Sequence, residues 1–417
     1  MTNNDKMTID ERRKYLRIMQ KRYAQASHRN RSLLLGEMEH VTALDRKTLL
    51  RAMRADLERK PRRKERGRTY GAEVDDTLRI IAETLDYIAA ERLTPNLVWM
   101  ANHLAQHGEL QVSAELLAQL EHITVSTVRR ILQRVGQDQP RLPRSKGLRT
   151  RTALHEIPMK RIPWDEPMPG HFETDLVHHC GPSTTGDYVH TLQMIDVKTG
   201  WSERVAVLGR SYLVMEDAFR HILKRLPFPV LEIHPDNGSE FFSAHLLRFW
   251  KDVIQGLELS RSHPFRKNDN RFVEQKNDTL VRAYLGHDRL DSVAQAKALN
   301  TLYEKLWLFY NLFQPVMRLQ EKTFVQVEGQ PTQVKRRFDE ARTPFERLCA
   351  TKALTPEREQ HLRDLRDQTN PRRLRQEILA LRDRIFSLPN AIPGITEHVF
   401  DTLTEPPSSQ EGDGALG

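Results

Sequence analysis

The stretch HFETDLVHHCGPSTTGDYVHTLQMIDVKTGWSERVAVLG, residues 171–209, decides the fold of the central part of the chain. It contains three runs rich in β-branched and aromatic residues, at 171–179, 188–197 and 201–209. A loop of glycine, serine, threonine and aspartate joins the first two runs, and the short turn Lys-Thr-Gly joins the last two. Runs of this composition separated by turn residues are typical of β-hairpins, so the stretch predicts three consecutive antiparallel strands.

Helical and extended patterns alternate after this stretch. Three antiparallel strands followed by alternating helices and strands predict a mixed five-stranded sheet covered by helices, an α/β core that we place at residues 169–316. The further elements are an amphipathic helix at 212–227, a strand at 230–238, a helix at 243–257, a short strand at 258–263, a helix from Asn270 and a longer helix over 292–313.

The first 62 residues favour a helix-turn-helix DNA-binding domain. Two short helices are expected within residues 31–55, with Asp45 as the N-cap of the second, because its oxygen can accept an orphan amide of the first turn. The second helix is cationic, and Arg46, Lys47 and Arg51 are its candidate DNA contacts. A small helical bundle with a solvated basic face is the alternative.

Residues 68–137 repeat this outline without repeating its sequence. The segment 112–136 holds two amphipathic helices, and Ser126 is expected to cap the second. That helix carries the candidate DNA contacts Arg129, Arg130 and Arg134. Two such units in tandem favour DNA binding, because two modules can read one longer site.

The rest of the chain outside the core divides into four segments. Residues 138–168 form a basic, proline-rich linker in which Lys146, Arg149 and Arg151 are candidate phosphate contacts. Residues 317–352 are expected to be a small β-rich basic domain, which the family described below suggests is a barrel. A helical segment follows at 353–404, and a disordered tail at 405–417.

Composition narrows the class of protein. The formal net charge is +9 and the pI is near 9.5, which favours a polyanionic partner such as nucleic acid. Two cysteines cannot build a disulfide framework or a zinc–cysteine cluster. No apolar run approaches the roughly 18 residues of a membrane span, and no apolar signal segment opens the chain, so we expect a cytoplasmic protein without a membrane partner.

Three carboxylates are the candidate catalytic residues. Asp175 lies inside an apolar strand, where a charge costs free energy unless it is paired, hydrogen-bonded or bound to metal. Asp236 follows a strand, although Asp-Asn-Gly is also an ordinary turn. Glu274 borders the apolar strip of a helix, where it could instead cap the helix or form a surface salt bridge. Such a set suits hard cations, Mg²⁺ or Mn²⁺, and two such ions can activate an attacking oxygen and stabilise a leaving one.

At these motifs the chain resembles a known family. Asp175 in the first strand, HPDNGSEF around Asp236 and RKNDNRFVEQKN around Glu274 are similar, in order and spacing, to the catalytic core of retroviral integrases and bacterial insertion-sequence transposases, the DDE superfamily. The resemblance implies a ribonuclease-H-like fold in which Asp175, Asp236 and Glu274 hold two Mg²⁺ (or Mn²⁺) ions. It also implies hydrolytic nicking at element ends, followed by attack of the freed 3′-hydroxyl on target DNA.

The resemblance also implies partners. They are double-stranded DNA, comprising the terminal inverted repeats of the element and the target, and further copies of the chain assembled on that DNA. We expect a nucleoid-associated protein, and the sequence leaves open whether an accessory ATPase takes part. Cations near the glutamate are expected to hold phosphates: Arg266, Lys267, Lys276 and Arg282.

The chain departs from the family pattern at two points. The chain has too few cysteines for the N-terminal His₂Cys₂ zinc module of retroviral integrases. The lysine or arginine that many members carry seven residues after the glutamate is Val281 here, so Lys276 and Asn277 are candidate substitutes. A domesticated protein that only binds DNA and a metal-dependent nuclease of the same fold without strand transfer remain alternative functions.

Overall fold

The computed structural model divides the chain into two compact units, Met1–Thr69 and Tyr70–Gly417. Each unit is described by itself. The residues described are 7, 9–57, 69–135, 166–235, 241, 244–254, 256–260, 271–325 and 333–403.

The first unit is a bundle of three helices: α1 (Ile9–Gln25), α2 (His28–Thr42) and α3 (Arg46–Arg54). Its core is apolar and includes Met19, Met38 and Leu49. The predicted N-cap is confirmed, because the Asp45 carboxylate accepts a hydrogen bond from the Thr48 amide at 2.9 Å. The basic residues of α3 lie on the exposed side of this bundle.

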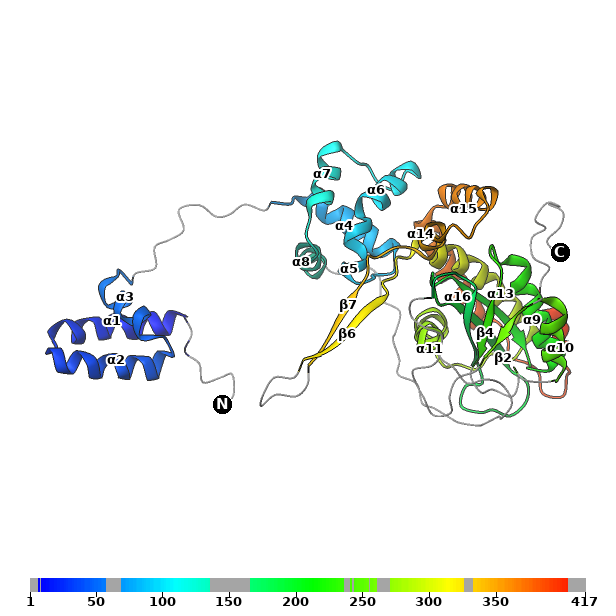
Figure 1. Ribbon diagram of the computed structural model, residues 1–417, viewed down its shortest axis with the longest axis horizontal. Coiled ribbons are helices and arrows are strands. Elements are labelled where there is room, and N and C mark those ends of the chain that lie inside the picture. The colour runs from blue at the N-terminus through cyan, green and yellow to red at the C-terminus, as the bar shows by residue number, and fades with distance from the viewer. Residues whose placement is uncertain are drawn as a thin grey trace. The chain divides into compact units, whose positions relative to one another are not determined.

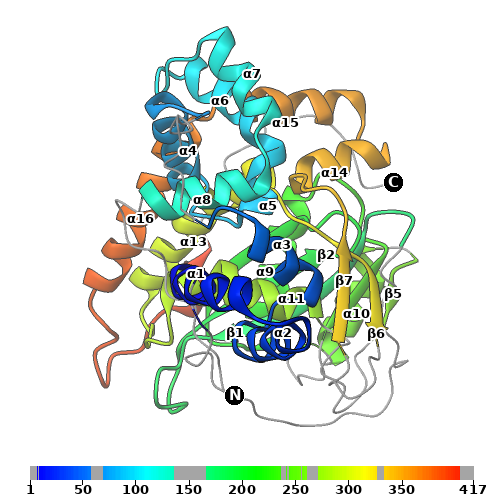
Figure 2. The ribbon, with the colours of Figure 1, turned by 90° about the vertical axis from the view of Figure 1, so that its left-hand side faces the viewer.

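The second helical block begins the larger unit and comprises five α-helices, gathered together in Figure 2. They are α4 (Ala72–Thr84), α5 (Ala90–Leu93), α6 (Leu97–Gln106), α7 (Ala114–His122) and α8 (Val125–Val135). Their apolar residues belong to the same continuous core as those of the sheet. The prediction that Ser126 caps the last helix is wrong: α8 starts one residue earlier, and the Thr124 hydroxyl accepts from the Thr127 amide.

The sheet has five strands in the order β3-β2-β1-β4-β5. They are β1 (His171–His178), β2 (Val189–Asp196), β3 (Ser202–Leu208), β4 (Glu232–Pro235) and β5 (Glu258–Leu259). The first three form an antiparallel meander, whereas β4 and β5 run parallel to β1. The mixed five-stranded sheet predicted from the sequence is therefore confirmed. Among the described residues, β4 begins two residues later than expected and Ser260 lies outside β5.

Helices cover the sheet, as Figure 1 shows. They are α9 (Tyr212–Arg225), α10 (Ala244–Val253), α11 (Arg271–Lys276), α12 (Ala283–Leu285) and α13 (Val293–Leu308). A π-helical segment, Asn277–Arg282, links α11 to α12, and another, Phe309–Phe313, extends α13. The start of α13 is fixed by a capping box, in which Ser292 and Gln295 exchange side-chain and backbone hydrogen bonds.

Two asparagines cover the edge of the sheet at β3. The Asn300 side chain accepts from the Ala206 amide at 2.7 Å and donates to the Ala206 carbonyl at 2.8 Å. Asn311 makes the same pair of bonds with Ser202, at 2.9 and 3.0 Å. Each asparagine side chain offers one donor and one acceptor to β3, and so takes the place of one residue of a neighbouring strand.

The segment after the core begins with a two-stranded antiparallel hairpin, β6 (Leu319–Val325) and β7 (Gln333–Phe338). In the described part of this segment the β structure is that hairpin, not the barrel that the family suggests. Three α-helices follow: α14 (Pro344–Thr351), α15 (Pro356–Gln368) and α16 (Pro371–Ser387), the last packed on α13. None of the described helices is long and apolar enough to cross a membrane.

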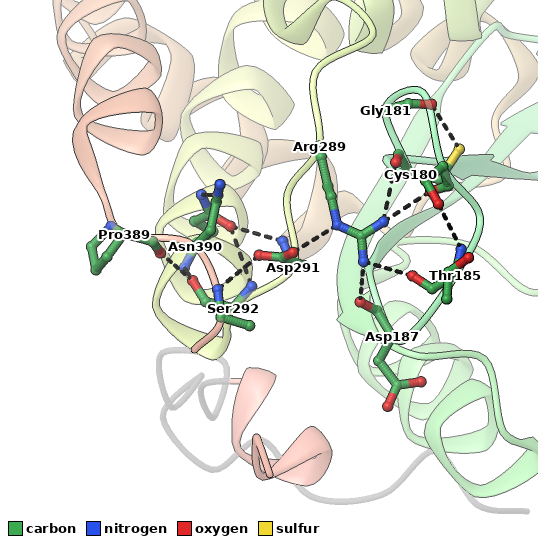
Figure 3. Close-up of polar contacts among 12 residues, drawn as sticks. Cys180, Gly181, Thr185, Asp187, Arg289, Asp291, Ser292, Pro389 and Asn390 are labelled. Carbon is green, nitrogen blue, oxygen red and sulfur yellow. Dashed lines mark hydrogen bonds and ion pairs between the residues drawn. The ribbon is translucent and has the colours of Figure 1, made fainter. Parts of the chain in front are cut away.

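The guanidinium of Arg289 holds the loop between β1 and β2 (Figure 3). It donates to the carbonyls of Cys180, Ser183, Thr185 and Asp187, over distances of 2.9 to 3.2 Å. Its fifth donor reaches the Asp291 carboxylate at 2.7 Å. All five donors of the side chain are used, so this arginine orders the loop and is not available to a ligand.

We expect Asn300→Leu to lower the free energy of unfolding by about 2–4 kcal/mol, because the buried amide and carbonyl of Ala206 would lose their partners. Denaturant unfolding would measure the loss. Thr301→Ala is the control, since that exposed hydroxyl donates only to the Lys297 carbonyl of its own helix. An Asn300 variant as stable as the control would mean that the edge does not need this cover.

Candidate functional site

One face of the sheet carries a row of polar side chains. Asp175 pairs with Gln193 on the neighbouring strand, and Gln193 pairs with Arg204 on the next, so all three side chains lie on the same face. Glu173 lies two residues before Asp175 and therefore shares that face, and it pairs with His234 of β4. Except for Asp175, which is half-buried, these side chains are buried, and α11 packs against β1 and β2.

Glu173 anchors the start of α11. One oxygen of its buried carboxylate accepts hydrogen bonds from the backbone amides of Phe272, at 2.7 Å, and Val273, at 3.0 Å. The first amides of a helix have no partner within the helix and lie at its positive end. The buried charge and the open helix terminus therefore satisfy each other.

Asp175 meets the same helix one turn further on. Its Oδ2 accepts from the Asn277 side chain at 2.5 Å, and its Oδ1 accepts from the Leu176 amide at 2.8 Å. Glu173 and Asp175 are two residues apart, which is about 7 Å along a strand, and four residues of a helix rise about 6 Å. The two contacts therefore fit a helix that runs along β1. The helix segment carrying Glu274 is thereby placed beside the strand carrying Asp175.

Glu274 lies between these two anchor points of the helix, and its side chain is exposed. The expected apolar strip of the helix is confirmed, because Val273, Leu280, Val281 and Tyr284 are all buried. Their burial turns this helix toward the sheet and leaves the carboxylate of Glu274 at the border of the packed face.

Asp236 lies outside the described residues, and β4 ends one residue before it, at Pro235. Among the described residues, no group of three His, Cys, Asp or Glu side chains gathers as a metal site. The donors that are described suit a hard cation: Asp175 and Glu274 offer carboxylate oxygens, and the carbonyl oxygen of Asn277 is buried without a hydrogen-bond partner. These residues fit a divalent ion of the Mg²⁺ type.

Several basic residues predicted to contact DNA have protein partners in the structure. Arg129 pairs with Glu91, and Arg134 pairs with Asp75 at 2.5 Å. Arg282 donates to the backbone carbonyls of His178, at 2.8 Å, and Gly286, at 3.1 Å. The Arg129 and Arg134 side chains stay partly exposed within these pairs.

Apart from Lys276, the other predicted contacts are either exposed or outside the described residues. Arg46, Lys47, Arg51 and Arg130 are exposed. Arg46 donates to the Ser32 hydroxyl, and Arg130 to that of Thr127. The following predicted contacts lie outside the described residues: Lys146, Arg149, Arg151, Arg266 and Lys267.

Lys276 lies among cations. Its ammonium group is 4.8 Å from the centre of the Tyr310 ring. Burial and the nearby guanidinium groups of Arg92, Arg318 and Arg204 lower its pKa to about 7. No ion pair with a carboxylate accompanies it in the described part of the structure.

Sequence reasoning missed Glu173, Gln193 and Arg204. The signal for Glu173 was present, because it alternates with Asp175 in an apolar strand and so must share its face. Gln193 and Arg204 required the register between strands, which the sequence does not provide. Arg204 is 2% exposed, and its guanidinium nitrogens have no hydrogen-bond acceptor. It lies instead near the rings of Tyr303 and Tyr310.

We expect Glu173→Met to lower stability by about 2 kcal/mol and to speed hydrogen exchange at the amides of Phe272 and Val273, which would lose their acceptor. Exchange measured by mass spectrometry or NMR would test this. Thr174→Val is a matched control, since its buried hydroxyl has no hydrogen-bond partner and it lies on the opposite face of β1. Equal exchange in both variants would contradict the anchoring role of Glu173.

Comparison with known proteins gives one clear sequence relative. The uncharacterized protein y4rM of Sinorhizobium fredii (strain NBRC 101917 / NGR234) is 32% identical over 308 residues, which cover 72% of this chain and 86% of that protein. No family model matches the chain.

Solved structures give weaker likenesses. The catalytic core domain of BIV integrase is 13% identical and covers 44% of this chain and 95% of its own, with a TM-score of 0.28. A simian T-cell lymphotropic virus intasome is 14% identical and covers 56% of this chain and 72% of its own, also with a TM-score of 0.28. At this score neither likeness bears on the fold, which rests on the order and register of the strands.

Proposed function

The chain belongs to the family of y4rM, and we propose that it is a metal-dependent DNA strand transferase of the DDE transposase and integrase type. It would bind the ends of a mobile element, nick them and join the freed 3′ ends to target DNA. The observation that carries the proposal is the pair of contacts from β1 to α11, through Glu173 and Asp175, which brings the Glu274 segment beside Asp175.

The proposed metal ligands are Asp175, Asp236 and Glu274. Two Mg²⁺ or Mn²⁺ ions held by these carboxylates would activate the attacking oxygen and stabilise the leaving oxygen. The remaining residues of the site position these ligands. Glu173 fixes the start of the helix that carries Glu274, and Asn277 holds the Asp175 carboxylate by a hydrogen bond.

The proposed DNA contacts are the exposed cations. In the first unit, α3 presents Arg46, Lys47 and Arg51 beside its buried Leu49, an arrangement suited to phosphate contact from one helix face. In the larger unit, Arg130 on α8 is exposed as well. Terminal inverted repeats, target DNA, further copies of the chain and an accessory ATPase are its proposed partners, in a cytoplasmic, nucleoid-associated protein.

The test is a strand-transfer assay with Mg²⁺ or Mn²⁺ and labelled DNA ends taken from beside the gene. We expect joined products with the wild-type chain, and a loss of more than about 100-fold for Asp175→Asn, Asp236→Asn and Glu274→Gln, since each removes a metal-ligand charge while keeping the size of the side chain.

Asp217→Asn is the control for this assay. It removes one exposed carboxylate from α9 and should keep full activity. Activity retained in the three ligand variants would show that other carboxylates hold the metal. Nicking without joining by the wild-type chain would replace the proposal with a nuclease of the same fold.

A further inference from the structure

A pocket of about 290 Å³ lies where α11, the π-helical extension of α13 and the β6–β7 hairpin meet. Its walls combine cations with aromatic rings. The cations are Lys276, Arg318 and Arg336, and the rings are Phe272, Tyr310 and Phe338.

The pocket gathers donors that have no acceptor. The hydroxyl of Tyr310 and the Nη1 of Arg318 are buried without a hydrogen-bond partner. Arg318 is held in place by its other terminal nitrogen, which donates to the Asp196 carbonyl at 3.1 Å. A buried donor without an acceptor costs free energy. Two of them in residues that line one pocket show that hydrogen-bond acceptors are scarce beside it.

The charge of the pocket has one sign. No carboxylate is among its lining residues in the described part of the chain. The Lys276 ammonium contacts the face of the Tyr310 ring at 4.8 Å, and the Arg318 guanidinium lies over the Phe272 ring at 4.7 Å. The carboxylates of Asp196 and Asp339 act on Arg318 without lining the pocket. Like charges gathered in a pocket that no carboxylate lines favour the binding of an anion.

The size and the rings of the pocket exclude a bare inorganic anion as its best ligand. A volume of 290 Å³ is close to the lower limit of small-molecule sites, and much of the wall is apolar. Phe338 is 46% exposed on the hairpin and offers an open ring face. Cations beside exposed aromatic rings are the features that bind single-stranded nucleic acid, where phosphates pair with cations and bases stack on rings.

We propose that this pocket binds one nucleotide of a single DNA strand, with its phosphate on Lys276, Arg318 and Arg336 and its base against Phe338. The inference rests on the proposed function in one respect only, namely that the polyanion is DNA.

The pocket lies close to the candidate metal site. Ile195 lines it and pairs with Glu173, whereas the next residue on the same face, Gln193, pairs with Asp175. Gln193 and Ile195 are two residues apart and therefore about 7 Å apart along the strand. Gln275, which follows Glu274 directly, lines the pocket as well. A nucleotide held there would therefore lie beside the candidate metal site.

The test is the affinity of the full-length chain for a short, labelled single-stranded oligonucleotide, measured by fluorescence anisotropy without divalent metal. We expect Arg336→Gln and Phe338→Ala to weaken binding about tenfold, since each removes one charge-assisted or stacking contact. Arg336→Gln should also reduce the slope of log affinity against log salt by about 0.7. Both side chains are exposed on β7, so folding should not be affected.

Lys335→Gln is the matched control. It removes the same charge from the neighbouring residue of β7, whose side chain lies on the opposite face of the hairpin. We expect less than a twofold change. A loss equal to that of Arg336→Gln would overturn the proposal, because binding would then follow total charge alone. No loss in Arg336→Gln would overturn it as well, because Arg336 would then not contact the strand.

Competition by thymidine monophosphate and by inorganic phosphate distinguishes a site for a nucleotide from a site for phosphate alone. We expect the nucleotide to compete with the oligonucleotide on the wild-type chain better than phosphate does, and this advantage to be lost in Phe338→Ala. If the nucleotide binds but oligonucleotide affinity is the same in all variants, the pocket serves a free nucleotide and the proposal is wrong. Because this assay involves no catalysis, a chain inactive in strand transfer can still pass it.

Discussion

The buried carboxylate of Glu173 is the interaction on which the candidate site depends. An isolated charge inside a protein costs several kcal/mol, and the open amides at the start of a short helix are costly when buried as well. Glu173 and α11 compensate each other through two hydrogen bonds, and this joins the helix to the central strand at a defined height. The contact between Asp175 and Asn277 then fixes its rotation. A π-helical segment begins at Asn277, a feature often found at functional sites.

Much of the core could be predicted from the sequence, because alternation, turns and caps are local signals. The three-stranded meander, the apolar strip of the Glu274 helix and the Asp45 cap of α3 are all confirmed. Boundaries were less accurate where signals competed. At α8, Ser126 was the expected cap, but the helix begins at Val125 and Thr124 takes the capping position.

The parts of the site that could not be predicted depend on register and on long-range packing. The row from Asp175 through Gln193 to Arg204 exists because three strands align, and no local pattern encodes that alignment. The same holds for the ion pairs of Arg129 and Arg134, which appeared from the sequence to be free for DNA. Their partners come from other helices of the block.

The asparagine pair at β3 has a consequence for how copies of the chain can associate. An open sheet edge is a template on which a strand of another molecule can add, because its amides and carbonyls are unpaired. Here the side chains of Asn300 and Asn311 form hydrogen bonds with the backbone amides and carbonyls of Ala206 and Ser202. Between them, Arg225 donates to the Arg204 carbonyl at 3.2 Å. A continuous sheet across two molecules is therefore blocked at β3. At the β3 edge, copies of the chain can therefore associate only through side-chain contacts.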